Sequence, residues 1–227
     1  MTETLALNEK SFNMGEIALN YVEVGAASAD ATPMVLLHGG LRWWHDWQPV
    51  IPQFAANWHV YAYDQRGHGK SGRDGDHYHL TDFARDSTAF LRALVGEPAV
   101  LVGQSLGALV SLATAAQAPE NVRAMVLLDP PLFMREAELK PMQIEHTKSY
   151  NDWFNFLRTT LSKVQSYDEL VAQLSAVFPG GDEARVKIMA DSIYGLDPAM
   201  IDITLEGRLF DGFDTEATLK RITCPLL

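Results

Sequence analysis

The residues best suited to chemistry lie at positions 103–107, which read Gly-Gln-Ser-Leu-Gly. The short apolar run Ala99–Val102 precedes this pattern, and helix-compatible residues follow it as far as Ala118. A strand, a sharp turn and a helix in this order would expose the hydroxyl of Ser105, which could then act as a nucleophile. The start of the helix would offer backbone N–H groups to a developing oxyanion. A turn rich in small residues is the alternative interpretation.

Two other patterns are similar to binding motifs but lack the required context. Residues 67–72 match the spacing G-x-G-x-x-G, yet a loop at Arg73–His77 follows them instead of the helix that a dinucleotide site needs. Asp74–His79 contains two histidines and two carboxylates, but no other cluster of metal ligands complements them. We therefore expect a solvated loop there, with no cofactor and no metal ion.

The elements around Ser105 predict an α/β fold with a doubly wound, mostly parallel sheet. Residues 11–25 indicate an N-terminal antiparallel hairpin. Continuous apolar runs predict strands buried on both faces at Pro33–Leu37, Trp58–Tyr63, Ala99–Val102 and Val122–Leu128. These strands alternate with helical segments at Trp47–Ala56 and at Thr81–Val95, the second with Thr81 as its N-cap. Such alternation is typical of a parallel sheet covered on both faces.

Residues 133–218 break this alternation, because their apolar residues recur at helical spacing and no comparable strand occurs among them. We expect residues 1–132 to form the core and 133–218 to form an all-helical cap inserted after the sixth strand. A separate helical domain is the alternative. Residues 219–227 match the start of a further core strand. A chain that ends inside such a strand would leave a poorly paired edge, so we expect a fragment whose final strands are missing.

Composition narrows the class of protein. The chain has 227 residues and a net charge of −11, so it offers no basic surplus for nucleic acid. Apolar residues make up 47% and charged residues 21%, as in ordinary soluble globular proteins. The single cysteine, Cys224, excludes an internal disulfide and suits a reducing compartment. No secretory signal or membrane span is visible, so we expect a cytoplasmic protein that binds no membrane.

Three motifs together resemble those of the α/β-hydrolase superfamily, in its serine-nucleophile form with a helical cap. They are residues 38–40 (His-Gly-Gly) after the third strand, residues 64–72 after the fourth strand, and residues 103–107 after the fifth. The resemblance covers nearly the whole chain and implies the α/β-hydrolase fold. It also implies that Ser105 is the nucleophile and that the backbone N–H groups of Gly40 and Leu106 form the oxyanion hole.

The resemblance also implies a catalytic acid after the seventh strand and a histidine after the eighth, both beyond Leu227. A serine without its base is a poor nucleophile, so we expect the chain as given to be inactive or nearly so. Asp129, at the end of the sixth strand, is the alternative acid, because some family members keep their acid there. His146, in the first predicted cap helix, is the alternative base.

The activity that the resemblance implies is hydrolysis of a small, partly apolar carboxylic ester or related acyl compound through an acyl-enzyme. Serine instead of aspartate at position 105 disfavours epoxide hydrolase and haloalkane dehalogenase chemistry. Carboxylesterase, enol-lactonase, carbon–carbon bond hydrolase and perhydrolase activities are not separated by these motifs. We expect Trp43, Trp44 and Gln104 to contact the small-molecule substrate. A non-catalytic small-molecule binding protein on the same fold is the alternative, and nothing indicates the oligomeric state.

Overall fold

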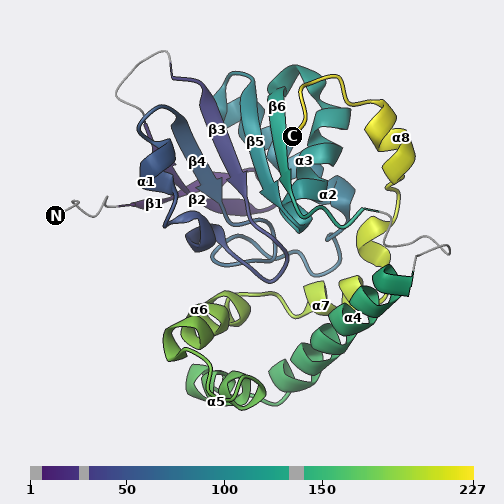
Figure 1. Cartoon of the computed structure of the whole chain (residues 1–227). Coiled ribbons are helices and arrows are strands. Elements are labelled where there is room, and N and C mark those ends of the chain that lie inside the picture. The colour runs from purple at the N-terminus through teal and green to yellow at the C-terminus, as the bar shows by residue number, and fades with distance from the viewer. Residues whose placement is uncertain (1–6, 26–30, 133–140) are drawn as a thin grey trace.

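The computed structural model describes residues 7–25, 31–132 and 141–227, and only the backbone of 141–147. The described residues form one six-stranded sheet in the order β1-β2-β4-β3-β5-β6 (Figure 1). The antiparallel hairpin consists of β1 (Glu9–Asn13) and β2 (Ala18–Val24), and β2 also pairs antiparallel with β4. The parallel strands are β3 (Pro33–Leu37), β4 (His59–Tyr63), β5 (Ala99–Gln104) and β6 (Val122–Leu128). The predicted mostly parallel α/β sheet is confirmed.

Side chains that point alternately to the two faces of the sheet form two apolar cores, one on each face. In β3, Val35 and Leu37 belong to the larger apolar cluster, whereas Met34 and Leu36 belong to the smaller one. The larger cluster lies under helices α2 (Leu80–Phe90) and α3 (Leu106–Gln117), which pack against each other. The smaller cluster includes residues of the short helices η1 (Trp44–Trp47) and α1 (Ile51–Phe54). This two-sided burial explains the continuous apolar runs in the sequence.

Two predicted helices differ in their limits. The segment predicted as Trp47–Ala56 splits into η1 and α1, because prolines 49 and 52 have no N–H to continue a helical hydrogen-bond pattern. The segment predicted as Thr81–Val95 begins one residue earlier, as α2, and ends in a π-helical turn, η2 (Leu91–Val95). Its N-cap is His79 and not Thr81, because the Asp82 carboxylate accepts a hydrogen bond from the His79 backbone N–H at 3.0 Å.

Residues 141–220 are mainly helical, and Figure 1 shows most of them as a layer across one end of the sheet. Residues 133–140, the predicted start of the cap, lie outside the described residues. We call residues 141–210 the helical layer; it comprises α4 (Pro141–Leu161), α5 (Tyr167–Val177), α6 (Glu183–Tyr194), α7 (Ala199–Leu205) and η4 (Arg208–Phe210). None of the described helices is long and apolar enough to cross a membrane.

The last residues of the sequence return to the sheet. Helix α8 (Thr215–Lys220) packs against α3, so residue 218, the predicted end of the cap, falls inside a helix that lies on the core. Beyond it, the N–H of Met125 donates to the carbonyl of Pro225 at 2.9 Å. Leu227 exchanges hydrogen bonds of 2.8 and 3.0 Å with Leu127 and Met125. Residues 225–227 therefore lie in a parallel orientation along the free edge of β6.

Candidate active site

Ser105 lies on a tight turn between β5 and α3. Its backbone has φ 51° and ψ −112°, and its N–H donates to the carbonyl of Leu128 at 2.9 Å. The turn needs glycine on both sides. A Cβ at position 103 would lie 2.3 Å from the carbonyl oxygen of Gly107, and one at position 107 would lie 2.2 Å from that of Leu37. Strand and helix therefore approach each other at backbone contact, and Ser105 is forced out of the sheet.

Backbone strain gathers around this turn. Among the described residues, three that are not glycine have positive φ: Leu41 at 64°, Ser105 at 51° and Asp129 at 50°. Leu41 and Ser105 line the same cavity, and Asp129 directly follows β6, beside the end of β5. Each such conformation costs on the order of 1–3 kcal/mol and persists only where the surroundings impose it. The three strained residues therefore make this end of the sheet the candidate functional end.

Two backbone amides beside Ser105 are available to a ligand. The N–H of Gly40 and that of Leu106 have no hydrogen-bond partner among the described residues. Leu106 is the first residue of α3, where helical N–H groups have no acceptor within the helix. Gly40, Ser105 and Leu106 line one cavity. Two such amides could stabilise an oxyanion bound in this cavity, and a single donor in such a site typically contributes about 3–4 kcal/mol.

A buried histidine fixes the start of the turn that carries Gly40. The Nε2 of His38 accepts a hydrogen bond from the N–H of Gln65 at 2.9 Å, so that nitrogen carries no proton. Its Nδ1 lies 2.7 Å from the carbonyl oxygen of Gly39 and donates to it. Complete burial lowers the pKa of His38 to about 4, so the ring is neutral at pH 7. Both ring nitrogens are occupied, so His38 positions the turn and does not serve as a base.

A second buried histidine holds the end of the same turn. The Nε2 of His68 accepts from the N–H of Leu41 at 3.3 Å, and its Nδ1 donates to the carbonyl of Arg66 at 2.9 Å. Burial, and then the proximity of His38, lower the pKa of His68 to about 3. A neutral imidazole thus accepts the backbone N–H of Leu41, the residue with positive φ.

Asp64 ties together the segments around these histidines. Its carboxylate accepts hydrogen bonds from the backbone N–H of Trp44 at 2.8 Å, from that of Lys70 at 3.0 Å and from the Asn20 amide at 2.9 Å. Burial raises the pKa of Asp64, and the three donors oppose this shift. The carboxylate therefore organises the loop between β4 and α2 from within.

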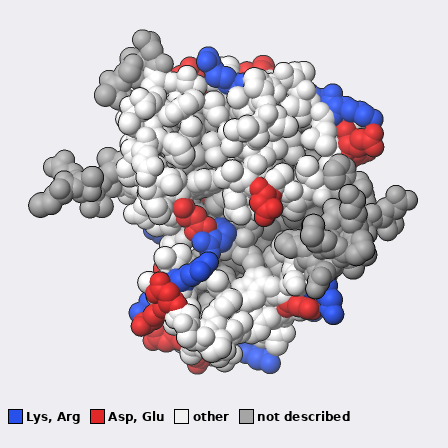
Figure 2. Space-filling view, in the orientation of Figure 1, with Lys and Arg blue, Asp and Glu red and all other residues white. Residues whose placement is uncertain are grey.

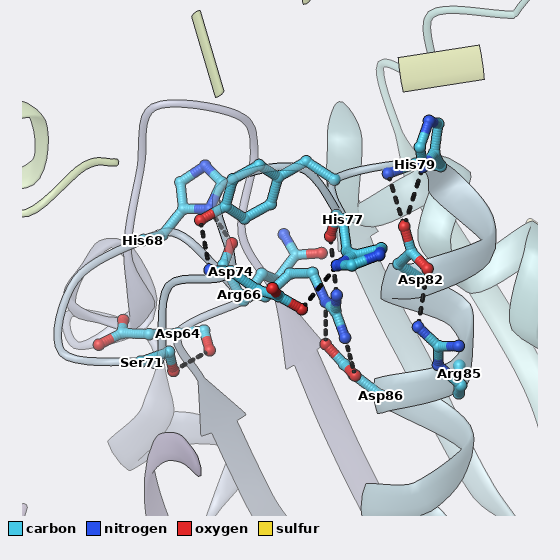
Figure 3. A network of polar contacts seen from close by, with 12 residues as sticks. Asp64, Arg66, His68, Ser71, Asp74, His77, His79, Asp82, Arg85 and Asp86 are labelled. Atoms are coloured by element: carbon cyan, nitrogen blue, oxygen red, sulfur yellow. Dashed lines mark hydrogen bonds and ion pairs between the residues drawn. The ribbon is translucent and has the colours of Figure 1, made fainter. Parts of the chain in front are cut away.

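A buried ion pair fastens the same loop to α2 (Figure 3). The guanidinium of Arg66 binds both carboxylate oxygens of Asp86 at 2.6 Å and donates to the carbonyl of His77 at 2.7 Å. Such a bidentate pair fixes orientation as well as distance. Removing one partner of a buried pair typically costs about 3–5 kcal/mol, because the other charge is left uncompensated.

Two cavities of different chemistry meet at Ser105 and Gly40. The first, of about 330 Å³, is mainly apolar and lies between the sheet and the helical layer; its walls include Leu106, Leu109, Trp153, Phe154, Met200 and Leu209. Tyr150 also lines it, and burial raises the pKa of this tyrosine to about 12. The second, of about 440 Å³, is polar and is lined by Gly39, Arg42, Asp46, Gln104, Arg185, Ile188 and Met189. A substrate whose carbonyl group lies at Ser105 would place one of its two substituents in each cavity.

The residues expected to bind substrate fall in three different places. Gln104 lines the polar cavity. Trp43 lines a third cavity, of about 500 Å³, which shares Arg42 and Asp46 with the polar one. Trp44 corrects the expectation. It is 2% exposed and its Nε1 donates to Glu9 at 3.0 Å, so it packs in the core and lines neither cavity at Ser105.

Of the two alternative members of a triad, Asp129 lies after β6 beside the end of β5 but lines neither cavity at Ser105. Asp129 is exposed and has no hydrogen bond or ion pair among the described residues. His146 falls in α4, but its side chain lies outside the described part of the chain. No described histidine lines either cavity at Ser105. In the described residues, no group of three or more His, Cys, Asp or Glu side chains could hold a metal ion.

The sequence analysis missed Arg42 and Arg185, which the structure brings to the same cavity wall as Ser105. The first follows the Gly39–Gly40 turn and the second lies in α6. No motif spacing connects them, because their proximity depends on how the helical layer folds back over the sheet. The only local signal in the sequence was the position of Arg42, shortly after the Gly39–Gly40 turn.

Curated proteins with similar sequences are hydrolases. The chain is 34% identical over 117 residues to a 2-(acetamidomethylene)succinate hydrolase of Mesorhizobium japonicum, a match that covers 52% of this chain and 41% of that protein. It is 36% identical over 118 residues to a 2-hydroxy-6-oxo-2,4-heptadienoate hydrolase of Pseudomonas putida, covering 50% and 41%. A bifunctional epoxide hydrolase 2 of Sus scrofa is 31% identical over 131 residues, 56% of this chain and 23% of that protein. The matched region thus spans less than half of each relative.

Solved structures show the same fold over almost the whole chain. The crystal structure of E-2-(acetamidomethylene)succinate hydrolase superposes with a TM-score of 0.71 at 23% identity, covering 97% of this chain and 79% of that one. The N-acyl homoserine lactonase AidH superposes with a TM-score of 0.71 at 18% identity, covering 97% and 76%. The model of the alpha/beta hydrolase fold family matches residues 32–167. The chain therefore belongs to the alpha/beta hydrolase fold family.

Proposed function

We propose that this protein is a serine hydrolase that cleaves a small carboxylic ester or related acyl compound through an acyl-enzyme. The observation that carries the proposal is the position of Ser105. It sits on a strained turn, beside two unpaired backbone amides, at the junction of two cavities. The hydrolase names of the curated relatives support the reaction class.

The proposed reaction follows from this arrangement. The Ser105 Oγ attacks the carbonyl carbon of the substrate while its proton passes to a general base. The amides of Gly40 and Leu106 stabilise the resulting oxyanion. The tetrahedral intermediate collapses, the leaving alcohol takes the proton, and an acyl-serine ester remains. Water, deprotonated by the same base, then attacks this ester and regenerates Ser105 with release of the carboxylic acid.

The proposal requires a general base that the described residues do not supply at Ser105. His38 is excluded because both its nitrogens are hydrogen-bonded and because burial lowers its pKa to about 4, which makes it a weak base. We therefore place the base, and the acid that orients it, outside the described residues. Asp129 stays the alternative acid, because it follows β6 beside the end of β5.

Carbon–carbon bond hydrolysis is a second candidate reaction for the same serine. The names of two relatives favour it: the 2-hydroxy-6-oxo-2,4-heptadienoate hydrolase above, and a 2-hydroxymuconate semialdehyde hydrolase of a Pseudomonas species, 38% identical over 100 residues. In both reactions the nucleophile, the oxyanion hole and the acyl-enzyme are the same, and only the leaving group differs.

The decisive experiment uses the full-length gene product and a fluorophosphonate probe, which modifies only an activated serine. We expect labelling at Ser105 and hydrolysis of methyl and p-nitrophenyl esters. Ser105→Ala should abolish labelling and lower kcat by about 10³-fold or more. Ser175→Ala, at an exposed serine of α5, is the control and should change neither. Tight binding of an ester without labelling or turnover would instead support a non-catalytic binding protein.

A further inference from the structure

The polar cavity at Ser105 contains two arginines in an otherwise acidic protein. The chain carries a net charge of −11, yet the ionisable side chains that line this cavity are Arg42, Arg185 and Asp46, with a net charge of +1. Gln104 and the turn at Gly39–Gly40 complete the polar part of the wall. Figure 2 shows basic and acidic side chains gathered where the helical layer meets the core, at the edge of a hollow. The cavity is therefore a locally positive site beside the nucleophile.

Arg42 is held in place and keeps part of its binding capacity. Its Nη2 donates to Asp46 at 2.9 Å, and its Nε donates to the same carboxylate. This bidentate pair, four residues apart, fixes the direction of the guanidinium. Its Nη1 has no partner among the described residues. Asp46 therefore orients Arg42 and leaves one edge of the guanidinium for a ligand.

Arg185 has no ion-pair or hydrogen-bond partner among the described residues, although it lies on a helix whose other charges are engaged. On α6, Lys187 pairs with Glu183 at 2.7 Å, and Asp191 accepts a hydrogen bond from the Tyr167 hydroxyl at 2.6 Å. Asp191 faces the neighbouring cavity of about 500 Å³ and not the polar cavity. Arg185 thus lines the same cavity as Ser105, and all its N–H donors lack an acceptor among the described residues.

We propose that the polar cavity is a carboxylate subsite, in which Arg185, assisted by Arg42, binds an anionic group of the substrate. A planar guanidinium matches a carboxylate with two parallel hydrogen bonds. The substrate would then be an acyl compound whose reactive carbonyl lies at Ser105, with an apolar part in the cavity of about 330 Å³ and a carboxylate in the cavity of about 440 Å³. This inference rests on the proposed hydrolase function for its place in a reaction, but the binding itself can be tested separately.

The kinetic test compares pairs of esters in which one carboxylate is free in the first member and methylated in the second. Monomethyl and dimethyl esters of succinic, glutaric and adipic acid are assayed with the full-length gene product. We expect kcat/KM for the best monomethyl ester to exceed that of its dimethyl ester by about 10-fold or more, since hydrogen bonds to charged groups are the strong ones. Arg185→Gln should remove this preference, mainly by raising the KM of the monomethyl ester. Arg185→Lys should keep part of the preference.

The control variant lies on the same helix. Lys187→Gln removes the same charge from α6, but Lys187 does not line the polar cavity, so the preference should stay. If Arg185→Gln and Lys187→Gln act alike, general electrostatics and not a subsite explains the preference. If esters are hydrolysed without any preference for the carboxylate, the subsite is refuted and the hydrolase stands.

A binding measurement separates the subsite from catalysis. Ser105→Ala is titrated with monomethyl glutarate and with dimethyl glutarate by calorimetry. We expect tighter binding of the monomethyl ester, lost in the double variant with Arg185→Gln. This outcome would support the subsite even if Ser105 were never labelled and no ester were cleaved. Equal binding of both esters would refute it, whatever the catalytic result.

Discussion

The candidate site lies between two regions, which we call the floor and the roof, and each region is stabilised by different interactions. The floor consists of the turns at Gly39–Leu41 and Ser105, whose backbone is fixed by buried side chains and by backbone contacts too close for a Cβ. The roof is the helical layer. It shares the apolar cluster of the core, and its polar attachments to the core lie mainly at residues 195–197.

Those attachments involve one loop of the core. The Tyr78 hydroxyl donates to Asp197 at 2.6 Å, the N–H of Asp197 donates to the carbonyl of Gly67 at 2.7 Å, and Arg73 reaches the carbonyl of Gly195 at 3.2 Å. Buried networks of hydrogen bonds are rigid, whereas elements held by few contacts open more readily. In the proposed reaction, the floor would therefore hold the reacting groups in place, and the roof would set the size and charge of the substrate.

The largest effect should come from filling the close contact in the floor. In Gly107→Ala, the new Cβ would lie 2.2 Å from the carbonyl oxygen of Leu37 and 2.8 Å from that of His38. Both are backbone atoms that directly precede the floor turn at Gly39–Leu41, so we expect a loss of stability of about 3 kcal/mol or more and no activity. Thermal unfolding and esterase assays measure the two effects. Gly25→Ala, where the nearest atom is 4.0 Å away, should stay within about 0.5 kcal/mol. A stable, active Gly107→Ala variant would contradict the rigid floor.

Acid should weaken the floor next most strongly. The pKa of His38 is lowered from 6.5 to about 4 and that of His68 to about 3 by burial. The unfolded chain takes up these protons first, so the free energy of unfolding should fall as the pH drops from about 6.5 towards 4. Each unit of pKa difference corresponds to about 1.4 kcal/mol.

A histidine variant separates the histidine contribution to the pH dependence of the free energy of unfolding from the contribution of the carboxylates. His68→Gln should be less stable than the wild type at pH 7.5, because Leu41 loses its partner, and the gap should narrow as the pH falls to 4. Urea unfolding at a series of pH values measures the gap. A gap that stays constant across this range would show that His68 is not the neutral residue we describe.

Much of the floor could be predicted from the sequence, because its determinants are local. Glycines flank Ser105 at positions that the strand-turn-helix geometry requires, and the apolar run before them has the length of a buried strand. The N-cap residue of α2 could not be predicted correctly, since both Thr81 and His79 can cap a helix. The hydrogen bond from the His79 N–H to the Asp82 carboxylate makes His79 the N-cap. The intrinsic N-cap preferences of the two residue types alone would favour Thr81.

The roof could be predicted only as helical. Which of its side chains face Ser105 depends on contacts between distant segments, so neither Arg185 nor its proximity to Arg42 has a signal in the sequence. The same limit explains Trp44. Tryptophans at positions 43 and 44, shortly after the Gly39–Gly40 turn, favour a substrate pocket. However, Glu9, which is distant in the sequence, accepts a hydrogen bond from the indole N–H of Trp44 and holds this residue in the core.

A smaller effect should follow from loosening the roof. Tyr78→Phe removes the hydroxyl that donates to Asp197 and accepts from the N–H of Asp74 at 3.0 Å. We expect a loss of about 1–2 kcal/mol in stability and a rise in KM larger than any fall in kcat, because the floor is untouched. Tyr194→Phe is the matched control, since this tyrosine is 56% exposed and makes no described hydrogen bond through its hydroxyl. A fall in kcat alone would mean that the attachment acts on the floor instead.

The smallest effect should come from Asp129, the strained residue after β6 that makes no hydrogen bond or ion pair among the described residues. It is exposed, and asparagine also tolerates positive φ, so Asp129→Asn should cost less than about 0.5 kcal/mol. If the acid of the triad comes from elsewhere, kcat should fall by less than about 3-fold, compared with about 10³-fold for Ser105→Ala. A fall of about 100-fold in Asp129→Asn, with unchanged thermal unfolding, would instead make Asp129 the acid that orients the base. The strain at Asp129 would then serve the reaction directly, and the floor would extend from the Ser105 turn to the end of β6.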